Sequence, residues 1–270
     1  MSTLTIASDP QDAAAAEAVE AHHTQLAGEL AGRVAMLVAA AERDPATVDG
    51  VRAGLVDFCD RDLVPHAAAE EDALYPAARD LPAARLLVDG MLAEHRRLVA
   101  LVDRLRGAGS AVQAAADGQA LHVLFEEHVE KENTLILPLL AGSPDISLAG
   151  LLAGMHELLG HDHGGADVVA ESGGGVAAES GGGCGGACGC GGSDDADVPE
   201  LDVREVPHSL RHATVFGAIA AVPSGRAMVL VAPHDPLPLL AQIEDRHPGV
   251  FAVEYLQRGP EAWRLLLAHR

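Results

Sequence analysis

The sequence predicts an all-α antiparallel four-helix bundle, followed by a disordered Gly-rich linker and a small α+β two-layer sandwich. Apolar residues recur with helical spacing through the first 160 residues, where Ala and Leu dominate. The segment after them holds Gly, Ser, Ala and Asp with almost no large apolar residue, which is typical of a flexible linker. After Pro199, strand-like and helix-like pieces alternate. We therefore expect a bundle domain at 12–159, a linker at 160–198 and a second domain at 199–270.

Four helical stretches make up the predicted bundle, at residues 12–42, 47–75, 82–105 and 110–137. Asp44 and Pro45 end the first stretch, and Ser110 can cap the fourth. Pro65 interrupts the second stretch, which we expect to be kinked there rather than restarted with Asp62 as a cap. Because the connections are short, sequential helices should run antiparallel.

A short amphipathic segment at 148–159 is expected to pack on the outside of the bundle. In the second domain the expected order is strand, helix, strand, helix, strand, strand, at residues 201–204, 210–221, 227–231, 238–246, 251–256 and 263–268. Elements in this order fit a two-layer sandwich of helices on a sheet.

Composition argues against several classes of partner. With 18 basic and 40 acidic residues the chain has a formal net charge of −22, so a nucleic-acid backbone or an anionic membrane surface would repel it. No apolar run approaches the roughly 18 residues that span a bilayer, and the N-terminus has no signal-peptide pattern. We expect a soluble cytoplasmic protein with no nucleic-acid and no membrane partner.

One motif occurs twice in the chain, 62 residues apart. Each copy has a histidine, a glutamate four residues later and a proline ten residues later, so the imidazole and the carboxylate share one helix face. The two copies begin with the pairs His66 and Glu70, and His128 and Glu132. Upstream of each copy a further histidine precedes a leucine by three residues, at His23 and at His95.

Four helices that each direct one of these groups inward would bring four imidazoles and two carboxylates together in the bundle core. Such a donor set suits a dinuclear metal site, because a carboxylate can bridge two ions. The alternative is that each pair is a surface ion pair, which Ala-rich helices with many Glu residues readily produce. The matching tails of the two copies favour the metal site. The candidate metal ligands are His23, His66, Glu70, His95, His128 and Glu132.

Other polar residues near the two motifs are not expected to be metal ligands. His22 points about 100° away from His23 around the helix, so only one of the two should face the core, and the repeat selects His23. His122 is expected on the surface or behind the ligands. Several carboxylates near the motifs are either outer partners of the site or part of a solvated acidic face, namely Glu71, Asp72, Glu94, Glu126 and Glu127.

On these motifs, residues 12 to about 140 resemble a hemerythrin-like, His-His-Glu cation-binding domain. The resemblance implies a four-helix fold and a cofactor of two iron ions, that is, a non-haem di-iron centre. It also implies two histidines on each iron and two bridging glutamates. By position, His23 and His66 would bind one iron and His95 and His128 the other. Glu70 and Glu132 would bridge the two irons.

The chain departs from the oxygen-carrying hemerythrins in two places. The residue four after His95 is Val99, where their third helix has a second histidine. The fourth-helix carboxylate is Glu132, four residues after its histidine, where they have an aspartate five residues after it. Fewer imidazoles leave more open metal positions, which favours redox reactivity, sensing or iron handling over reversible oxygen carriage.

We therefore expect a di-iron protein that senses or reacts with oxygen, nitric oxide or peroxide and passes that state to a protein partner through its C-terminal domain. Two other interpretations remain open. One is a redox enzyme with ferroxidase or peroxide reductase activity, and the other is iron storage or delivery for cluster repair. A sensor and a slow catalyst would share all of these sequence features.

The linker and the second domain carry further candidates. Cys184, Cys188 and Cys190 lie within seven residues, which suits either a metal or redox role or a reactive tail of minor function. The C-terminal segment resembles an uncharacterised domain family often fused to hemerythrin-like domains, with a fold similar to that of TusA-like sulfur carriers. Those carriers use a cysteine beside the first strand, and no cysteine follows Cys190, so sulfur transfer by this domain alone is not expected. His212 and His234 are candidates for a ligand site, with turn and cap roles as the alternative.

Overall fold

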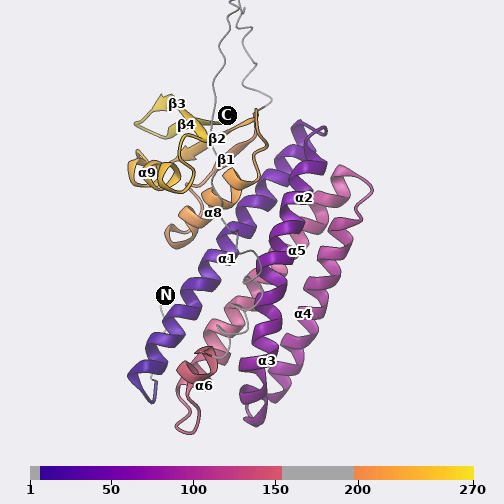
Figure 1. The fold of residues 1–270 in the computed structure, drawn as a ribbon, viewed down its shortest axis with the longest axis vertical. Coiled ribbons are helices and arrows are strands. Elements are labelled where there is room, and N and C mark those ends of the chain that lie inside the picture. Colours follow the sequence, from indigo (N-terminus) through magenta and orange to yellow (C-terminus); the bar gives the residue numbers. More distant parts are fainter. Residues whose placement is uncertain (1–6, 154–197) are drawn as a thin grey trace, which may run out of the picture.

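The computed structural model describes residues 7–153 and 198–270. The expected linker before Val198, with its three cysteines, and the end of the expected amphipathic segment lie outside these ranges. The described residues form a long helical bundle and a smaller unit of strands and helices that lies against one of the bundle helices (Figure 1).

Four helical rods form the bundle and confirm the fold predicted for this part of the chain (Figure 1). The second and fourth rods each contain a π-helical segment between two α-helices. In chain order the elements are α1 (Pro10–Arg43), α2 (Val48–Phe58), η1 (Cys59–Leu63), α3 (Val64–Asp80), α4 (Arg85–Arg106), α5 (Ala111–Lys131), η2 (Glu132–Ile136) and α6 (Leu137–Ala141). Ser110 caps α5 as expected, since its Oγ accepts a hydrogen bond from the backbone N–H of Gln113 at 3.2 Å.

Prolines explain both π-helical segments. A proline has no N–H for the carbonyl four residues earlier, and its ring clashes with that carbonyl in an α-helix. For Pro65 this carbonyl belongs to Arg61, and for Pro138 it belongs to Thr134. Each of these two residues stands in the middle of a π-helical segment, whose wider turn accommodates the proline. The second rod is therefore continuous through Pro65 and does not restart at Asp62.

The bundle core consists of two apolar clusters with a polar layer between them. The upper cluster, which includes Leu98, also contains residues of the C-terminal domain. The lower cluster includes Met91 and the buried Leu148 of the amphipathic segment, which is helical over the described residues 148–153. On α4 the candidate ligand His95 stands between Met91 and Leu98, and the candidate ligands of the other rods have equivalent positions.

The C-terminal domain has the predicted order of strands and helices: β1 (Glu200–Asp202), α8 (His208–Ala220), β2 (Ala227–Ala232), α9 (Leu237–Arg246), β3 (Phe251–Arg258) and β4 (Trp263–His269). The sheet order is β1-β2-β4-β3, with β1 parallel to β2 and the other pairs antiparallel. Met228 and Leu230 of β2 share a cluster with residues of α8 and α9, whereas Val229 and Val231 belong to a separate cluster. Both helices therefore cover one face of the sheet, as expected for a two-layer sandwich.

Helix α8 packs closely against α1 because the residues in contact are small. A Cβ atom added at Gly32 would lie 2.6 Å from the backbone N of Ala218, and one added at Gly217 would lie 2.7 Å from the Cα of Glu29. Only glycine allows two helix backbones to approach this closely. The upper apolar cluster continues through this contact into the C-terminal domain. The two domains thus share a core in addition to their connection along the chain.

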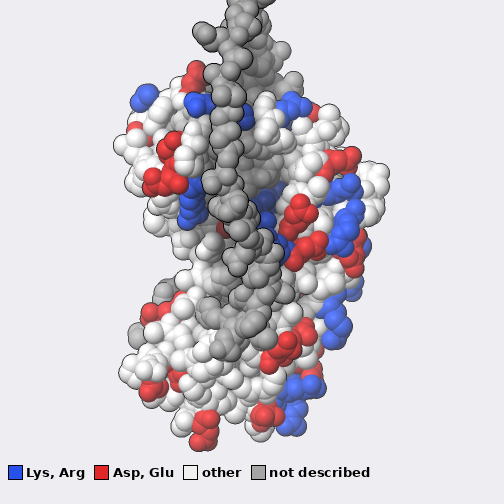
Figure 2. Space-filling model, viewed as in Figure 1, with Lys and Arg blue, Asp and Glu red and all other residues white. Residues whose placement is uncertain are grey.

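Charged side chains of both signs are mixed over part of the surface. On the face drawn in Figure 2, basic side chains lie among acidic ones at the top and along the right edge, whereas the lower left shows acidic side chains only. Exposed charges also pair directly, as in Arg106 and Asp60, whose Nη2 and Oδ1 atoms are 2.7 Å apart. Within residues 7–153 and 198–270, none of the helices combines the length and apolar character that crossing a bilayer requires.

Candidate metal centre

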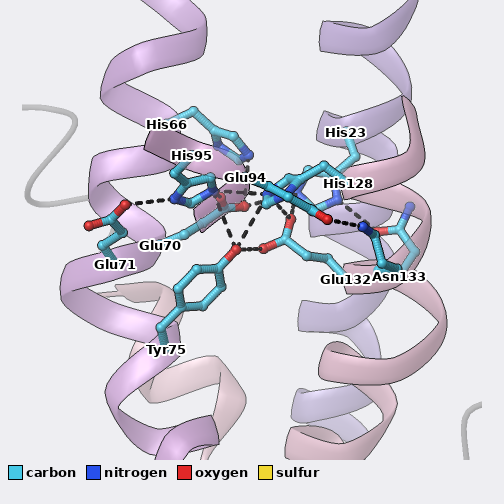
Figure 3. Close-up of polar contacts among 11 residues, drawn as sticks. His23, His66, Glu70, Glu71, Tyr75, Glu94, His95, His128, Glu132 and Asn133 are labelled. Carbon is cyan, nitrogen blue, oxygen red and sulfur yellow. Dashed lines mark hydrogen bonds and ion pairs between the residues drawn. The ribbon is translucent and has the colours of Figure 1, made fainter. Parts of the chain in front are cut away.

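All six predicted ligands meet in the polar layer of the bundle (Figure 3). The four rods contribute one histidine each, and the second and fourth rods add one glutamate each. None of these side chains belongs to a residue that is more than 3% exposed. They are His23 on α1, His66 and Glu70 on α3, His95 on α4, His128 on α5 and Glu132 at the start of η2.

The donor atoms form two overlapping groups. Within each group the donor atoms lie within 4.8 Å of one another, which suits one cation. One group has three members and the other has four, and Glu70 belongs to both. The groups are His23, His66 and Glu70, and Glu70, His95, His128 and Glu132. A carboxylate shared by two donor groups is in position to bridge two cations.

Glu70 lies at the centre of the cluster. Its Oε1 is 2.9 Å from His66 Nε2 and 3.2 Å from His23 Nε2, and its Oε2 is 3.5 Å from His95 Nε2. Burial alone would raise the pKa of this carboxyl group, but the surrounding imidazoles, His66 foremost, hold the pKa well below its ordinary value. Glu70 is therefore ionised and offers negative charge to cations on both sides.

Glu132, the second carboxyl group of the cluster, has the opposite shift. Burial and the neighbouring charge of Glu70 raise the pKa of Glu132 well above its ordinary value. Burial and Glu132 in turn raise the pKa of Tyr75, which keeps its proton and donates a hydrogen bond to Glu132 Oε1 at 2.5 Å. Glu132 thus holds a proton while no cation is bound, and a bound cation would displace it.

His95 and His128 face each other through their Nε2 atoms, which are 2.9 Å apart. Their Nδ1 atoms face outward, His95 Nδ1 at 2.8 Å from Glu71 Oε1 and His128 Nδ1 at 3.0 Å from Glu94 Oε2. Burial lowers the pKa of His95, but Glu70 and Glu71 outweigh this and raise it. Burial and the neighbouring His95 lower the pKa of His128 to about 4. A proton on His95 can therefore bridge the two nitrogens, in a place where a cation would also fit.

Hydrogen bonds at Nδ1 orient three of the four imidazoles so that their Nε2 atoms face the centre of the cluster. Glu71 and Glu94 hold His95 and His128, and Asn133 Oδ1 lies 2.7 Å from His23 Nδ1. Glu94 is itself paired with the ammonium group of Lys131. In metal proteins such outer partners fix the tautomer and the orientation of the ligating imidazole.

The variant Glu94→Gln tests this orientation. Glutamine keeps the shape of the side chain but removes the charge between His128 and Lys131, so we expect the cation affinity of the four-member group to fall about 10- to 100-fold. Competition with a metal chelator measures this affinity. Glu126→Gln is the matched control, because Glu126 pairs with His122 outside the cluster, Oε1 to Nε2 at 3.1 Å. Equal losses in the two variants would contradict an orienting role for Glu94.

The phenol of Tyr75 is a part of the site that the repeated motif does not reveal. Leu137 occupies the matching position in the second copy, so the alignment of the copies indicates an apolar side chain there. In the structure the Tyr75 hydroxyl lies 3.4 Å from Nε2 of both His95 and His128 and points at Glu132 (Figure 3). The sequence did carry one indication of this role, since Tyr75 has a hydroxyl group where the second copy has the apolar Leu137.

We expect Tyr75→Phe to destabilise the metal-free protein. The change leaves a buried oxygen of Glu132 without its donor, which should lower the free energy of unfolding by about 1–3 kcal/mol. Urea unfolding measures this loss. Tyr255→Phe is the control, since Tyr255 also donates to a carboxylate, Asp235 Oδ1 at 2.8 Å, but at a partly exposed position. A loss no larger than that of the control would argue against a buried Tyr75–Glu132 bond.

The remaining sequence candidates near the motifs lie outside the cluster. His22 is exposed and contacts the His66 ring edge-on, with 4.9 Å between ring centroids, so His23 alone of the adjacent pair enters the core, as predicted. Of the neighbouring carboxylates, Glu71 and Glu94 support histidines. The others are exposed, namely Asp72, Glu126 and Glu127. Besides Tyr75, the sequence reasoning missed Lys131 and Asn133, polar residues directly beside Glu132.

The chemistry of the cluster fits cations. Glu132 Oε2 is buried and has no hydrogen-bond partner among the described residues, and His66 Nε2 lies 2.9 Å from Glu70 Oε1 without the geometry of a hydrogen bond. An unpaired buried polar atom costs about 1–3 kcal/mol, and a cation held by these atoms would remove that cost. Imidazole suits iron, zinc, copper and nickel, and carboxylates suit harder cations, so the mixed set can hold a divalent metal in each group.

Comparison with known families agrees with this geometry. Residues 14–140 match the Hemerythrin HHE cation binding domain, a range that contains all six residues of the cluster. Residues 200–269 match Uncharacterized conserved protein (DUF2249). No curated protein and no solved structure matches the chain. The chain therefore carries a hemerythrin HHE cation-binding domain at residues 14–140, joined to a domain of the DUF2249 family.

Proposed function

We propose that this protein binds two iron ions and uses them to sense or react with oxygen, nitric oxide or peroxide, and that its C-terminal domain passes the resulting state to a protein partner. The position of Glu70 in both donor groups carries the proposal. A shared carboxylate holds two metal ions close enough to act together on one small molecule. When bound, a pair of irons supplies one-electron redox chemistry towards such molecules.

The donor types support iron. The group of His23, His66 and Glu70 consists of two imidazoles and one carboxylate, the set that holds non-haem Fe(II) with open positions in oxygen-using proteins. The other group offers four residues, which also leaves positions free in a six-coordinate site. Apolar clusters lie on both sides of the polar layer, so the donor atoms are enclosed. A diatomic molecule or peroxide therefore suits this centre better than a large substrate.

Residues of the cluster can balance the charge changes of such chemistry. Glu70 stays ionised between the two groups, and its negative charge favours the cationic state of both. The phenol of Tyr75 keeps its proton and donates a hydrogen bond to Glu132 Oε1, which would lose its own proton when a cation binds. Tyr75 can therefore stabilise negative charge at the centre through a hydrogen bond, without a water molecule entering the core.

Helix α1 offers a physical link between the centre and the C-terminal domain. It carries His23, and within the next three turns it carries Gly28 and Gly32, against which α8 packs. A displacement of α1 that accompanies a change at the centre would be transmitted directly to α8. This link supports a role for the C-terminal domain in passing on the state of the centre.

Anaerobic purification, followed by elemental analysis and visible spectroscopy, tests the proposal. We expect about two irons per chain, as for other bundle-core dinuclear sites, and a change in the visible spectrum when air or nitric oxide is added. Iron that remains bound after combined His66→Ala and His128→Ala substitution would show that the cluster is not the iron site. Sustained peroxide consumption with an electron donor would assign the same site to an enzyme.

A further inference from the structure

Three imidazoles and a guanidinium group line one small depression of the C-terminal domain. Its volume is about 70 Å³. The polar side chains that line it are those of His208, Arg211, His212 and His234, and the rest of the described lining is apolar or proline. The two histidines singled out from the sequence, His212 and His234, thus do meet, together with two further nitrogen donors.

The fold places this depression where strand-and-helix domains often bind ligands. Strands β1 and β2 are parallel, and the depression lies beyond their carboxyl ends, next to Val203 after β1 and Pro233 after β2. Helix α8 begins at His208 and α9 at Leu237, so both helices start near this edge. In sheets of this kind, ligands bind in the crevice outside the carboxyl ends of parallel strands.

Arg211 braces one side of the depression, and prolines stiffen the other. On α8, His208 and His212 stand four residues apart and share a helix face. Arg211 donates from Nε to the carbonyl oxygen of Val206 at 2.8 Å and from Nη2 to that of Arg204 at 3.2 Å, which braces the loop before α8. On the opposite side, the loop that carries His234 is stiffened by prolines that also line the depression, namely Pro233, Pro236 and Pro238.

Two carboxylates next in sequence to lining residues are engaged elsewhere, which leaves the depression rich in hydrogen-bond donors. Asp202 is bound by Arg204, Oδ2 to Nη2 at 2.6 Å, and Asp235 accepts the hydrogen bond from Tyr255. Neither carboxylate lines the depression. The guanidinium of Arg211 therefore supplies an uncompensated positive charge in a chain whose net charge is −22.

We propose that this depression binds one small tetrahedral oxyanion, either phosphate or the phosphoryl group of a larger molecule. Guanidinium and imidazole N–H groups are the donors that such an anion requires. A cation is disfavoured for two reasons. Arg211 repels it, and among the described residues at this place no three His, Cys, Asp or Glu ligand atoms lie within 4.8 Å of one another. The inference does not depend on the function proposed for the bundle.

Calorimetric titration of the full-length protein with inorganic phosphate, at constant ionic strength, tests the proposal. We expect saturable binding that weakens about 10-fold or more in His234→Gln and in His208→Gln, since each loses a hydrogen bond to a charged group. His247→Gln is the control, because His247 follows α9 and packs its ring against Phe251, outside the depression. Thermal unfolding shows that each variant is folded.

Three results would overturn the proposal. They are the absence of saturable heat, equal heat from chloride, and phosphate affinity in His234→Gln equal to that of the unmodified protein. If His234→Gln bound one Zn²⁺ ion fewer than the unmodified protein, with phosphate binding unchanged, the depression would be a cation site instead. Phenyl phosphate separates the two possible sources of the anion: tighter binding than inorganic phosphate assigns the depression to a phosphorylated molecule, and weaker binding assigns it to the free anion.

Discussion

Glu70→Ala is expected to abolish the cation site of His23 and His66 and to weaken the other site. Each donor group loses its shared member, and three imidazoles lose the carboxylate that lies 2.9–3.5 Å from their Nε2 atoms. The remaining members of the smaller group are two imidazoles, too few to hold a metal ion in competition with water and buffer. Elemental analysis after reconstitution with excess iron should find no more than about one metal ion per chain, at His95, His128 and Glu132.

Two variants give this prediction its controls. Glu132 belongs to the four-member group only, so Glu132→Ala should cost one cation and leave the other bound at His23, His66 and Glu70. Glu126→Ala lies outside both groups and should cost none. Two cations retained in Glu70→Ala would refute its bridging position, and two retained in Glu132→Ala would show that this residue is not a ligand.

Gly32→Leu should separate the C-terminal domain from the bundle. Even a Cβ atom at this position would overlap the backbone of α8, at the carbonyl oxygen of Thr214 and the N of Ala218, and backbone atoms cannot move aside as a side chain can. We expect a loss of more than about 3 kcal/mol, the upper range for overpacked cores, because the helix contact cannot form at all. Small-angle scattering should show a larger radius of gyration, and the thermal transition should split or fall.

Gly54→Leu is the matched control for this experiment. Gly54 lies within α2, and a Cβ atom added there meets nothing within 4 Å. Leucine is a better helix former than glycine, which is about 0.8–1.0 kcal/mol less favourable than alanine, so this variant should be as stable as the unmodified protein or slightly more stable. If Gly32→Leu kept the original radius and stability, the contact between α1 and α8 would not be what joins the domains.

The six residues of the cluster could be predicted to meet because two copies of one motif constrain each other. A single His-x-x-x-Glu pair is ambiguous, but the second copy and the two upstream histidines select one imidazole on each rod. His23 rather than His22 faces inward for the same reason. The rods themselves followed from apolar periodicity and from breaks such as Asp44-Pro45.

Contacts between distant parts of the chain could not be predicted in this way. Gly28 and Gly32 weaken an isolated helix, and only the approach of α8 explains why glycine stands there. Tyr75 pairs with a carboxylate 57 residues away, which no local pattern encodes. The π-helical turns were also missed, although each could have been inferred from the proline four residues after its centre.

The polar layer also separates the two apolar clusters of the bundle, and we expect these to unfold as an upper and a lower unit. The upper unit gains stability from the C-terminal domain, because their apolar residues form one cluster, whereas the lower unit around Leu74 and Leu140 has no such support. Cations in the layer tie all four rods together between these units. When they are removed, we expect the lower unit to open by itself, with faster amide hydrogen exchange in α6 than around Leu30. If the proposed irons occupy the layer, iron supply would then set the lifetime of the protein, since proteases would cleave the open lower unit of the metal-free protein.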